Sequence, residues 1–445
     1  MKKITTYLFL LFAGFELAAQ TMEQKMDALV SAYAAQGQFN GTVLVGHQNK
    51  IVFQKGFGFR NTVRKEMNDA NSIFQVGSLT KQFTAAIIMQ LYQEKKLDLQ
   101  DKLSKYFPGF TNGDQITIEH LLTHTSGLFN YTNDSTVMHG DLAAHYSEEK
   151  FLDKFRTYPA DFAPGTEWNY SNTGYVILGY IISKIEKKPY ETVMRERILR
   201  PLGMNHSGFD FTHLSHPQKT TGYFYVHEGG REAPVVDSTI SHAAGALYAT
   251  VGDLYKWERA VSSNKILNEG SWKKVFTPYK NKYGYGWNLD TVFSRPITHH
   301  SGGIPGYLSY ILRFPGEDLS VIIVDNSSSN EIFKIAKGLS AIVLNQPYDL
   351  PTIKKGITLA PDVLQQYIGK YQLAPEFIIT ITVENNGLRA QATNQPVLEL
   401  LAEKEDHFFI KLVDAKIQFT KDEQGKVDGL ILFQNGQMPR AKKIQ

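Results

Sequence analysis

The chain has 445 residues, 42% of them hydrophobic, and a formal net charge of +3 at pH 7. This length exceeds what one compact core normally holds, so we expect two domains. The charges are balanced and form no basic stripe or lysine-arginine run, which excludes nucleic acid as an expected partner. The chain contains no cysteine. Disulfides, a thiolate nucleophile and a lipid anchor on an N-terminal cysteine are therefore excluded.

The first residues have the pattern of a secretory signal peptide. Lys2 and Lys3 precede an apolar run over residues 7–15 and the small residues Ala18 and Ala19, and we expect cleavage after Ala19. The apolar run is too short to span a bilayer, and no later segment is long and uncharged enough to do so. We therefore predict a signal peptide over 1–19 and a mature protein, without a membrane span, that is periplasmic or secreted.

A helix and a hairpin are predicted next. Residues 22–35 have helical spacing of apolar positions, and the strand-like runs 39–45 and 51–59 are separated by turn-forming residues 47–50.

Ser78 and Lys81 form the first motif that could carry chemistry, at the start of the very apolar run 83–91. In a helix, residues i and i+3 share a face, so the lysine amine could reach the serine hydroxyl. Burial would push Lys81 toward its neutral, basic form. A neighbouring base is what a serine needs to become a good nucleophile. Taken alone, the pair is equally compatible with a helix cap beside a lysine whose ammonium reaches solvent.

The same Ser-x-x-Lys spacing occurs at 147–150, 262–265 and 271–274, where the surroundings are polar. Ser147, followed by two glutamates, predicts the N-cap of a surface helix. Gly77 permits a tight turn before Ser78, and the buried helix follows directly. Context therefore favours Ser78 over the three other serines.

A short helix is predicted over 116–122, with Thr117 as its cap. The tract 124–158 that follows is rich in Tyr, His, Asn and Asp. A polar stretch of this length either borders a cleft or makes an ordinary excursion over the surface.

Tyr170 and Asn172 lie between a turn at 164–166 and a second apolar helix predicted over 176–185. This arrangement matches the one at Ser78 and could direct polar groups into a shared pocket. Tyr-x-Asn also occurs at 131–133 and 279–281, and an isolated tyrosine is compatible with a hydrogen-bonded interior hydroxyl.

His299, His300, Gly302 and Gly303 precede two predicted strands, 309–314 and 319–324. Glycines beside a strand allow close approach of another backbone or of a ligand, and leave an amide that could bind an oxyanion. Adjacent histidines in an extended segment point to opposite faces. We therefore expect neither a metal site nor a cofactor.

In their order along the chain, these three motifs resemble the serine β-lactamase-like family, which includes class C β-lactamases, penicillin-binding DD-peptidases and their esterase and aminopeptidase relatives. The family pattern is Ser-x-x-Lys, then Tyr-x-Asn, then Lys or His with x-Gly, and here it falls on Ser78 and Lys81, Tyr170 and Asn172, and His300 and Gly302. The runs 116–128, 164–166, 200–204 and 302–306 also resemble the family. The resemblance covers residues 22–345.

The resemblance implies an α+β fold, with an antiparallel sheet flanked by helices, a helical region beside it and an active site between them. It implies that Ser78 attacks a carbonyl carbon while Lys81 and Tyr170 take its proton, and that Asn172 binds Lys81 or a substrate amide. Backbone N–H groups of Ser78 and Gly303 would hold the oxyanion, and His300 and Gly302 would contact the substrate. A small molecule or a peptide is the implied substrate.

The departure from the family is His300, where β-lactamases and DD-peptidases usually carry the lysine of a Lys-Thr-Gly run. A lysine is a permanent cation for a substrate carboxylate, whereas a histidine is mostly neutral at pH 7. This disfavours efficient β-lactam hydrolysis and favours an esterase or a peptidase acting on peptides of unusual stereochemistry. The alternative is a non-catalytic module that binds peptidoglycan fragments, peptides or a partner protein.

The remaining chain changes character. We predict a hydrolase domain over 20–345, a linker over 346–363 and a C-terminal domain over 364–445. Alternating patterns and the turns Asn385-Asn386-Gly387 and Asn435-Gly436 indicate a small antiparallel β-barrel or sandwich. The expected strands are 377–383, 388–392, 398–401, 407–412, 416–420 and 429–434. This part looks like the C-terminal domain of unknown function often appended to the family, and it contains no convergent catalytic set.

Overall fold

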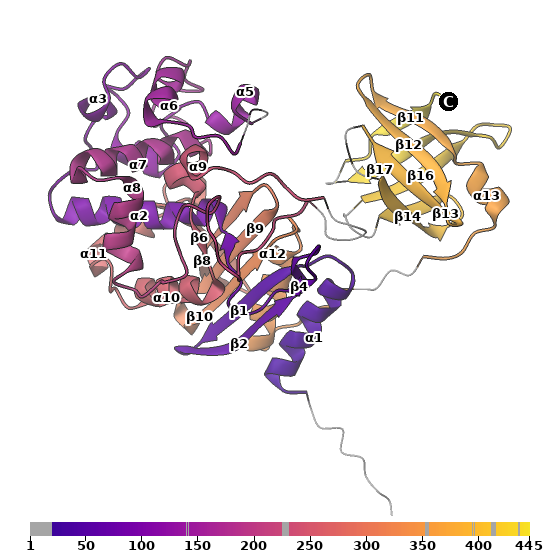
Figure 1. Ribbon diagram of the computed structural model, residues 1–445, viewed down its shortest axis with the longest axis horizontal. Coiled ribbons are helices and arrows are strands. Elements are labelled where there is room, and N and C mark those ends of the chain that lie inside the picture. Colours follow the sequence, from indigo (N-terminus) through magenta and orange to yellow (C-terminus); the bar gives the residue numbers. More distant parts are fainter. Residues whose placement is uncertain are drawn as a thin grey trace, which may run out of the picture.

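A computed structural model describes residues 20–445 except 139, 141, 225–230, 352–355, 394, 396, 411–414 and 435–436. The predicted signal peptide therefore lies outside the described residues. Figure 1 shows a larger unit, in which helices surround a sheet, and a β-barrel formed by the last part of the chain. The predicted α+β class with a barrel-like C-terminal part is confirmed.

The larger unit is built on a six-stranded sheet with the order β2-β1-β10-β9-β8-β7. All neighbouring strands are antiparallel. The N-terminal hairpin pairs with a strand from the far end of the unit, since Gly41 lies opposite Asp325. The strands are β1 Gly41–His47, β2 Lys50–Phe57, β7 Asn288–Val292, β8 Arg295–Ile304, β9 Tyr307–Phe314 and β10 Leu319–Asp325.

One face of the sheet is covered by α1 (Met22–Ala35) and α12 (Ile332–Val343). Alternation along β1 separates two cores, because Val43 and Val45 pack under these helices whereas Leu44 belongs to the core on the opposite face. α1 has the bounds that its spacing predicts, and Thr21 caps it through a capping box with Gln24.

The opposite face carries the helical region. Its central helix α2 (Thr80–Gln93) is buried on nearly all sides, as its apolar run predicts. The other helices are α3 Leu103–Tyr106, α4 Ile118–Leu122, α5 Ser135–Met138, α6 Glu148–Phe155, α7 Asn172–Glu186, α8 Tyr190–Met194, α9 Ser238–Gly245, α10 Val251–Ser262 and α11 Glu269–Val275. Short strands complete it: β3 Phe59–Asn61 with β4 Glu66–Met67, and β5 Phe74–Gln75 with β6 Tyr248–Ala249.

The C-terminal unit follows α13 (Pro361–Gln365) and is a closed barrel with its own hydrophobic core. Asn385 and Asn386 have φ of +49° and +59° in the turn between its second and third strands, which confirms the predicted hairpin. The second hairpin signal, Asn435-Gly436, lies outside the described residues. The strands are β11 Gly369–Ala374, β12 Phe377–Glu384, β13 Gly387–Ala392, β14 Val397–Lys404, β15 His407–Ile410, β16 Ala415–Lys421, β17 Val427–Gln434 and β18 Arg440–Lys443.

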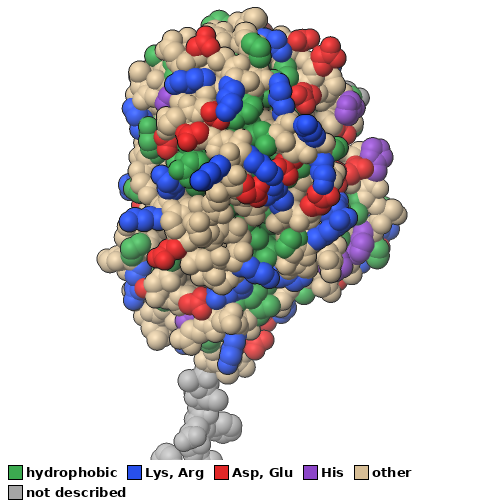
Figure 2. Space-filling model, turned by 90° about the vertical axis from the view of Figure 1, so that its left-hand side faces the viewer, with side chains coloured by type: hydrophobic (Ala, Val, Ile, Leu, Met, Phe, Trp, Pro, Cys, Tyr) green, Lys and Arg blue, Asp and Glu red, His purple; other side chains and the backbone are tan. Residues whose placement is uncertain are grey.

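The surface agrees with the balanced composition. On the face drawn in Figure 2, lysines and arginines lie among aspartates and glutamates. In the described part of the chain, no helix is long and apolar enough to cross a membrane.

Candidate active site

Ser78 lies in a tight turn rather than inside the α-helix. The 3-10 turn Gly77–Leu79 precedes α2, which begins at Thr80. Gly77 has a φ of +51°, and a Cβ added to it would lie 2.8 Å from the backbone N of Gly303. Only glycine suits this position. Thr80 fixes the turn from the helix side, because its Oγ1 donates a hydrogen bond to the Gly77 carbonyl at 2.7 Å.

Lys81 is completely buried and surrounded by oxygen atoms. Its Nζ donates to Asn172 Oδ1 at 2.7 Å and to the Ala244 carbonyl at 2.9 Å, and it lies 3.0 Å from Ser78 Oγ. Burial holds the pKa of Lys81 well below its ordinary value. The structure therefore places an amine with a lowered pKa against the serine hydroxyl. Neither a solvent-exposed ammonium nor a simple helix cap describes this geometry.

Asn172 is the first residue of α7, which begins four residues earlier than the predicted helix. Asn130 fixes the orientation of its amide, because Asn130 Oδ1 accepts hydrogen bonds from the Asn172 backbone N at 3.0 Å and from Nδ2 at 3.4 Å. With the amide nitrogen held by Asn130, the side-chain oxygen Oδ1 of Asn172 points to Lys81. Sequence reasoning missed Asn130, although it lies in the polar tract that was expected to border a cleft.

Tyr170 lies in the loop before α7 and contacts both members of the first motif. Its ring centroid is 4.8 Å from Lys81 Nζ. Burial raises the pKa of Tyr170, and a hydrogen bond with Ser78 opposes that increase. The phenol is therefore protonated at neutral pH and lies within reach of the serine oxygen.

Strand β8 passes directly against the Ser78 turn. A Cβ added to Gly302 would lie 2.0 Å from the Val76 carbonyl oxygen and 3.0 Å from the Ser78 backbone N, so the approach requires glycine. Ser309 on β9 secures the contact, because its Oγ donates to the Val76 carbonyl at 2.8 Å. Gly302 thus contacts the serine turn itself, and Gly303 follows at the rim of the adjoining cavity.

This cavity has a volume of about 110 Å³ and contains Ser78, Asn172 and Gly303 in its wall. The tract 124–158 does border it, as one of the two interpretations expected. Among the described residues that line it, none carries a charge. The other lining residues are Tyr131, Thr132, Met138, Leu142, Val236, Ile240, Ser241, Ala244, Gly245, Ile304 and Pro305.

Neither Lys81 nor Tyr170 is among the residues that line this cavity, and His300 is not among them either. It is 3% exposed, its Nε2 lies 3.0 Å from the Tyr283 hydroxyl and its Nδ1 lies 2.6 Å from the Ser301 carbonyl. Because a carbonyl can only accept, Nδ1 carries the proton and Nε2 accepts from Tyr283. Burial lowers the pKa of His300 to about 3. His300 is therefore neutral. His299 lies on the other face of the strand, as expected for adjacent residues, and its ring contacts Tyr310.

Two of the other Ser-x-x-Lys serines have hydrogen-bond partners for their side chains elsewhere. Ser147 Oγ caps α6 by accepting from the Lys150 backbone N at 3.2 Å, as predicted for a surface helix. Ser262 Oγ donates to Glu258 Oε1 at 2.8 Å. Among the four Ser-x-x-Lys pairs, all of them in described parts of the chain, only Lys81 makes a side-chain hydrogen bond to its serine.

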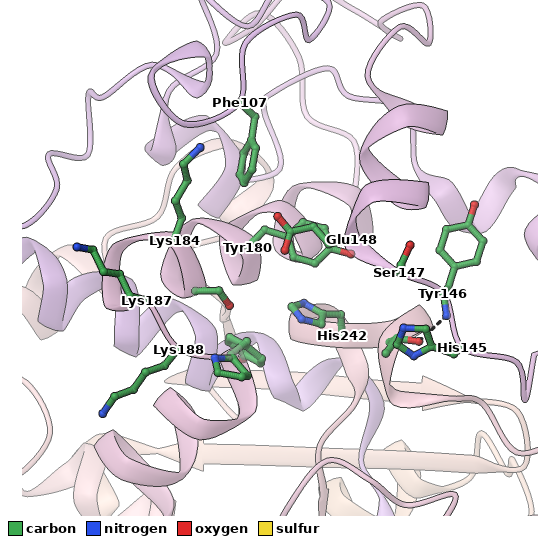
Figure 3. Close-up of a pocket in the computed structure, with 14 residues that line it drawn as sticks. Phe107, His145, Tyr146, Ser147, Glu148, Tyr180, Lys184, Lys187, Lys188 and His242 are labelled. Atoms are coloured by element: carbon green, nitrogen blue, oxygen red, sulfur yellow. Dashed lines mark hydrogen bonds between the residues drawn. The ribbon is translucent and has the colours of Figure 1, made fainter.

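A larger cavity of about 620 Å³ also borders α9, and Figure 3 shows its lining. Thr239 and His242 contribute to it from this helix, whereas Ile240 and Ala244 line the Ser78 cavity. In Figure 3, the amines of Lys187 and Lys188 extend away from His242. These two amines therefore do not meet the imidazole. Within the described ranges, no three His, Asp or Glu side chains form a group that could hold a metal ion.

Comparisons with known proteins agree with this geometry. The family model "Beta-lactamase" matches residues 24–344, and a domain of unknown function, DUF3471, matches residues 354–442. A penicillin-binding protein of Bacillus subtilis (strain 168) is 28% identical over 459 aligned residues, covering 96% of this chain and 100% of its own. The putative penicillin-binding protein PbpX of the same strain is 29% identical over 68% of this chain and 74% of its own.

Solved structures share the fold. The octameric penicillin-binding protein homologue from Pyrococcus abyssi superposes with a TM-score of 0.66 at 24% identity, over 94% of this chain and 98% of its own. The D-amino acid amidase from Ochrobactrum anthropi SV3 superposes with a TM-score of 0.61 at 24% identity, over 72% of this chain and 96% of its own. Because the family model spans most of the sequence, the chain belongs to the beta-lactamase family, which includes serine hydrolases and penicillin-binding proteins. In this chain the family domain is followed by a DUF3471 domain.

Proposed function

We propose that the protein is an exported serine hydrolase that transfers the acyl group of an ester, amide or peptide first to Ser78 and then to water. The observation that carries this proposal is the set of contacts around Lys81 Nζ, which joins Ser78, Asn172 and Ala244. A module that only binds ligands has no chemical need for a buried amine against a serine hydroxyl.

Lys81 acts as the base that activates Ser78. In its neutral form the amine has two N–H bonds and one lone pair. The oxygens of Asn172 and Ala244 accept those two bonds, at 2.7 Å and 2.9 Å. The lone pair then faces Ser78 Oγ, which donates its proton as it attacks the substrate carbonyl.

Tyr170 carries the proton to the leaving group. Its ring lies over Lys81, and its raised pKa keeps the phenol protonated until a more basic atom develops nearby. Backbone N–H groups of Ser78 and Gly303 hold the oxyanion of the tetrahedral intermediate, where each donor contributes about 10²- to 10³-fold in rate. Water then releases the acyl group by the reverse sequence of proton transfers.

The cavity favours a small, uncharged acyl group. Its described lining is mostly apolar and holds no cation, and His300 is neutral and bonded to Tyr283. A free carboxylate on the acyl portion would lose hydration there without gaining a charged partner. Esters, amides and peptides with a neutral acyl portion are therefore the proposed substrates, ahead of β-lactams that carry a carboxylate.

Labelling with a fluorophosphonate, followed by peptide mass mapping, tests the mechanism. We expect a single adduct on Ser78 and none in Ser78→Ala. Ser147→Ala is the matched control, because it removes the serine of another Ser-x-x-Lys pair and leaves the label unchanged. A folded wild-type protein that takes up no label and turns over no ester would instead support the ligand-binding alternative.

Two matched esters test the substrate class. We expect a 4-nitrophenyl ester of a short aliphatic acid to react faster than the same ester bearing a terminal carboxylate on its acyl chain. Preference for the charged ester would contradict the role assigned to the uncharged cavity.

A further inference from the structure

His124 lies in the run Thr123–Leu128, which has no role in the proposed mechanism. It is 1% exposed and has a φ of +60°, an uncommon backbone conformation for a residue with a side chain. Such strain in a buried residue requires compensating contacts. The hydrogen bonds of His124 are made to the segment that carries Tyr170, and its ring also packs against Tyr175 and Tyr283.

His124 binds this segment on both sides of Tyr170. Its carbonyl accepts a hydrogen bond from the Asn169 backbone N at 3.0 Å, and its ring Nδ1 accepts from the Ser171 backbone N at 3.2 Å. The His124 and Tyr170 rings also pack together, with centroids 4.3 Å apart and planes inclined by 40°. The backbone before and after Tyr170, and the ring itself, are thus all restrained by one residue.

The hydrogen bond from Ser171 determines the tautomer of His124. A backbone N–H can only donate, so Nδ1 must offer a lone pair and the single proton of the neutral ring sits on Nε2. Nε2 is buried and has no hydrogen-bond partner among the residues that the structure describes. Protonation of Nδ1 would place two N–H groups against each other, so it would break the bond to Ser171.

The surroundings also keep the ring uncharged. Burial, followed by the proximity of Lys81 and His300, holds the pKa of His124 well below its ordinary value. A second cation at this position would compete with protonation of Lys81 during the reaction. Five titratable groups in the described part of the chain face His124. They are Lys81 from α2, Tyr170 from the loop before α7, Tyr175 from α7, Tyr283 from the segment before β7 and His300 from β8.

We propose that His124 is a positioning residue, which in its neutral Nε2–H form holds Tyr170 in line with Ser78 and Lys81 through the Ser171 hydrogen bond. This inference rests on the proposed role of Tyr170 in the hydrolase mechanism. His124 itself does not contact the substrate in this scheme.

Two variants separate the hydrogen bond from the ring contact. His124→Phe keeps an aromatic ring but loses the acceptor, whereas His124→Asn loses the ring but can place its side-chain oxygen where Nδ1 was. We expect His124→Phe to lower kcat for ester turnover by about 10- to 100-fold with KM nearly unchanged, because small misplacements of a catalytic group cost this much. We expect His124→Asn to recover most of kcat.

His120→Gln is the control in the same run, since His120 Nδ1 accepts from the Thr117 backbone N in the capping box of α4 and a glutamine can do the same. Its kcat should match the wild type. Unchanged kcat in His124→Phe, or equal losses in the Phe and Asn variants, would overturn the proposal, because a purely structural role predicts no rescue by the acceptor.

The tautomer supplies a readout that does not depend on activity. Long-range proton-nitrogen NMR spectra, assigned by comparison with His124→Asn, should show His124 neutral, with its proton on Nε2, at and just below the ordinary histidine pKa of 6.5. A proton on Nδ1, or a charged ring at pH 6, would overturn the inference even if the enzyme is active. Absence of labelling at Ser78 in the wild type would instead overturn the proposed function, and with it the role assigned here. If His124→Phe does not fold, the NMR spectrum of the wild type and the kcat of His124→Asn still test the positioning role of His124.

Discussion

Two cavities border the helix α9, and the smaller of them, not the larger, adjoins the group of converging polar side chains. The smaller one, of about 110 Å³, adjoins Ser78 and Asn172, whose side chains meet at the amine of Lys81. The larger one, of about 620 Å³, contains Lys187 and Lys188, whose amines extend away from His242. Convergence of polar atoms on one point, rather than volume, is what distinguishes a site capable of chemistry.

The difference originates in α9 itself. Ala244 directs its backbone carbonyl to Lys81, while His242 packs its ring between Tyr180 and Tyr190, with centroids at 4.7 Å and 5.0 Å. One helix thus supplies a hydrogen-bond acceptor to the proposed base beside one cavity and contributes an aromatic ring to a cluster beside the other. Substitutions in the two cavities should therefore separate turnover from stability.

The largest effect is expected for Lys81→Met, which should lower ester turnover by about 10³-fold or more, because it removes the proposed base. The variant should fold, since a long apolar side chain suits a fully buried position. Lys184→Met, in the larger cavity, is the control and should retain full turnover. Comparable turnover in Lys81→Met and Lys184→Met would remove the contrast between the cavities.

Tyr170→Phe should lower kcat by about 10²-fold, because it removes the proposed proton carrier. The ring contacts to Lys81 and His124 remain, so the melting temperature should change little. Tyr180→Phe makes the same chemical change in the larger cavity and should not affect kcat. Steady-state kinetics on a neutral ester compares the pair, and a Tyr170→Phe enzyme with normal kcat would exclude the phenol from the mechanism.

The pH dependence of turnover should follow Lys81. The base must be neutral, so kcat/KM should rise with pH through the lowered pKa of Lys81 and level off well below the ordinary value of 10.5. The free energy of unfolding should also rise with pH. Because the pKa of Lys81 is lower in the folded than in the unfolded chain, its contribution to stability is fully present above 10.5 and is lost as pH falls through the folded-state pKa. Denaturant unfolding of the wild type and of Lys81→Met across this range should diverge toward acid. A constant difference would contradict the shift.

The smallest effect on turnover is expected for His242→Gln, which should leave kcat unchanged. Burial lowers the pKa of His242 from 6.5 to about 4, so its contribution to stability is present above 6.5 and is lost as pH falls through about 4. The variant should therefore resist acid unfolding better than the wild type. Circular dichroism during acid titration measures this, and an identical acid midpoint would argue against the shift.

Much of this arrangement could be predicted from the sequence, because periodicity and motif order are local. The bounds of α1, the cap at Ser147 and the Asn-Asn-Gly hairpin are each encoded within a few residues. The convergence at Lys81 could be anticipated only through a resemblance, since its partners come from distant segments. The export signal and the functional roles of the site residues stay predictions.

Other parts could not be predicted, for physical reasons. Ala244 acts through a backbone carbonyl, which any residue could supply, so its side chain gives no signal. Asn130 and Tyr283 lie in irregular segments, and only the tertiary fold brings them to Asn172 and His300. The strands β11 and β18, which close the barrel, were not predicted. β18 gives little signal because it is short and rich in charged residues.

The pairing of Gly41 with Asp325 has a consequence for how the protein matures. The first hairpin of the sheet has no further strand to pair with until β10 has emerged from the ribosome, and β8 reaches the Ser78 turn only shortly before that. Such distant pairings are slow to form and leave strand edges exposed in the meantime. Nascent chains that stop before β10 should therefore be prone to aggregate, and the proposed nucleophile Ser78 should acquire its full surroundings only when synthesis of the whole sheet is complete.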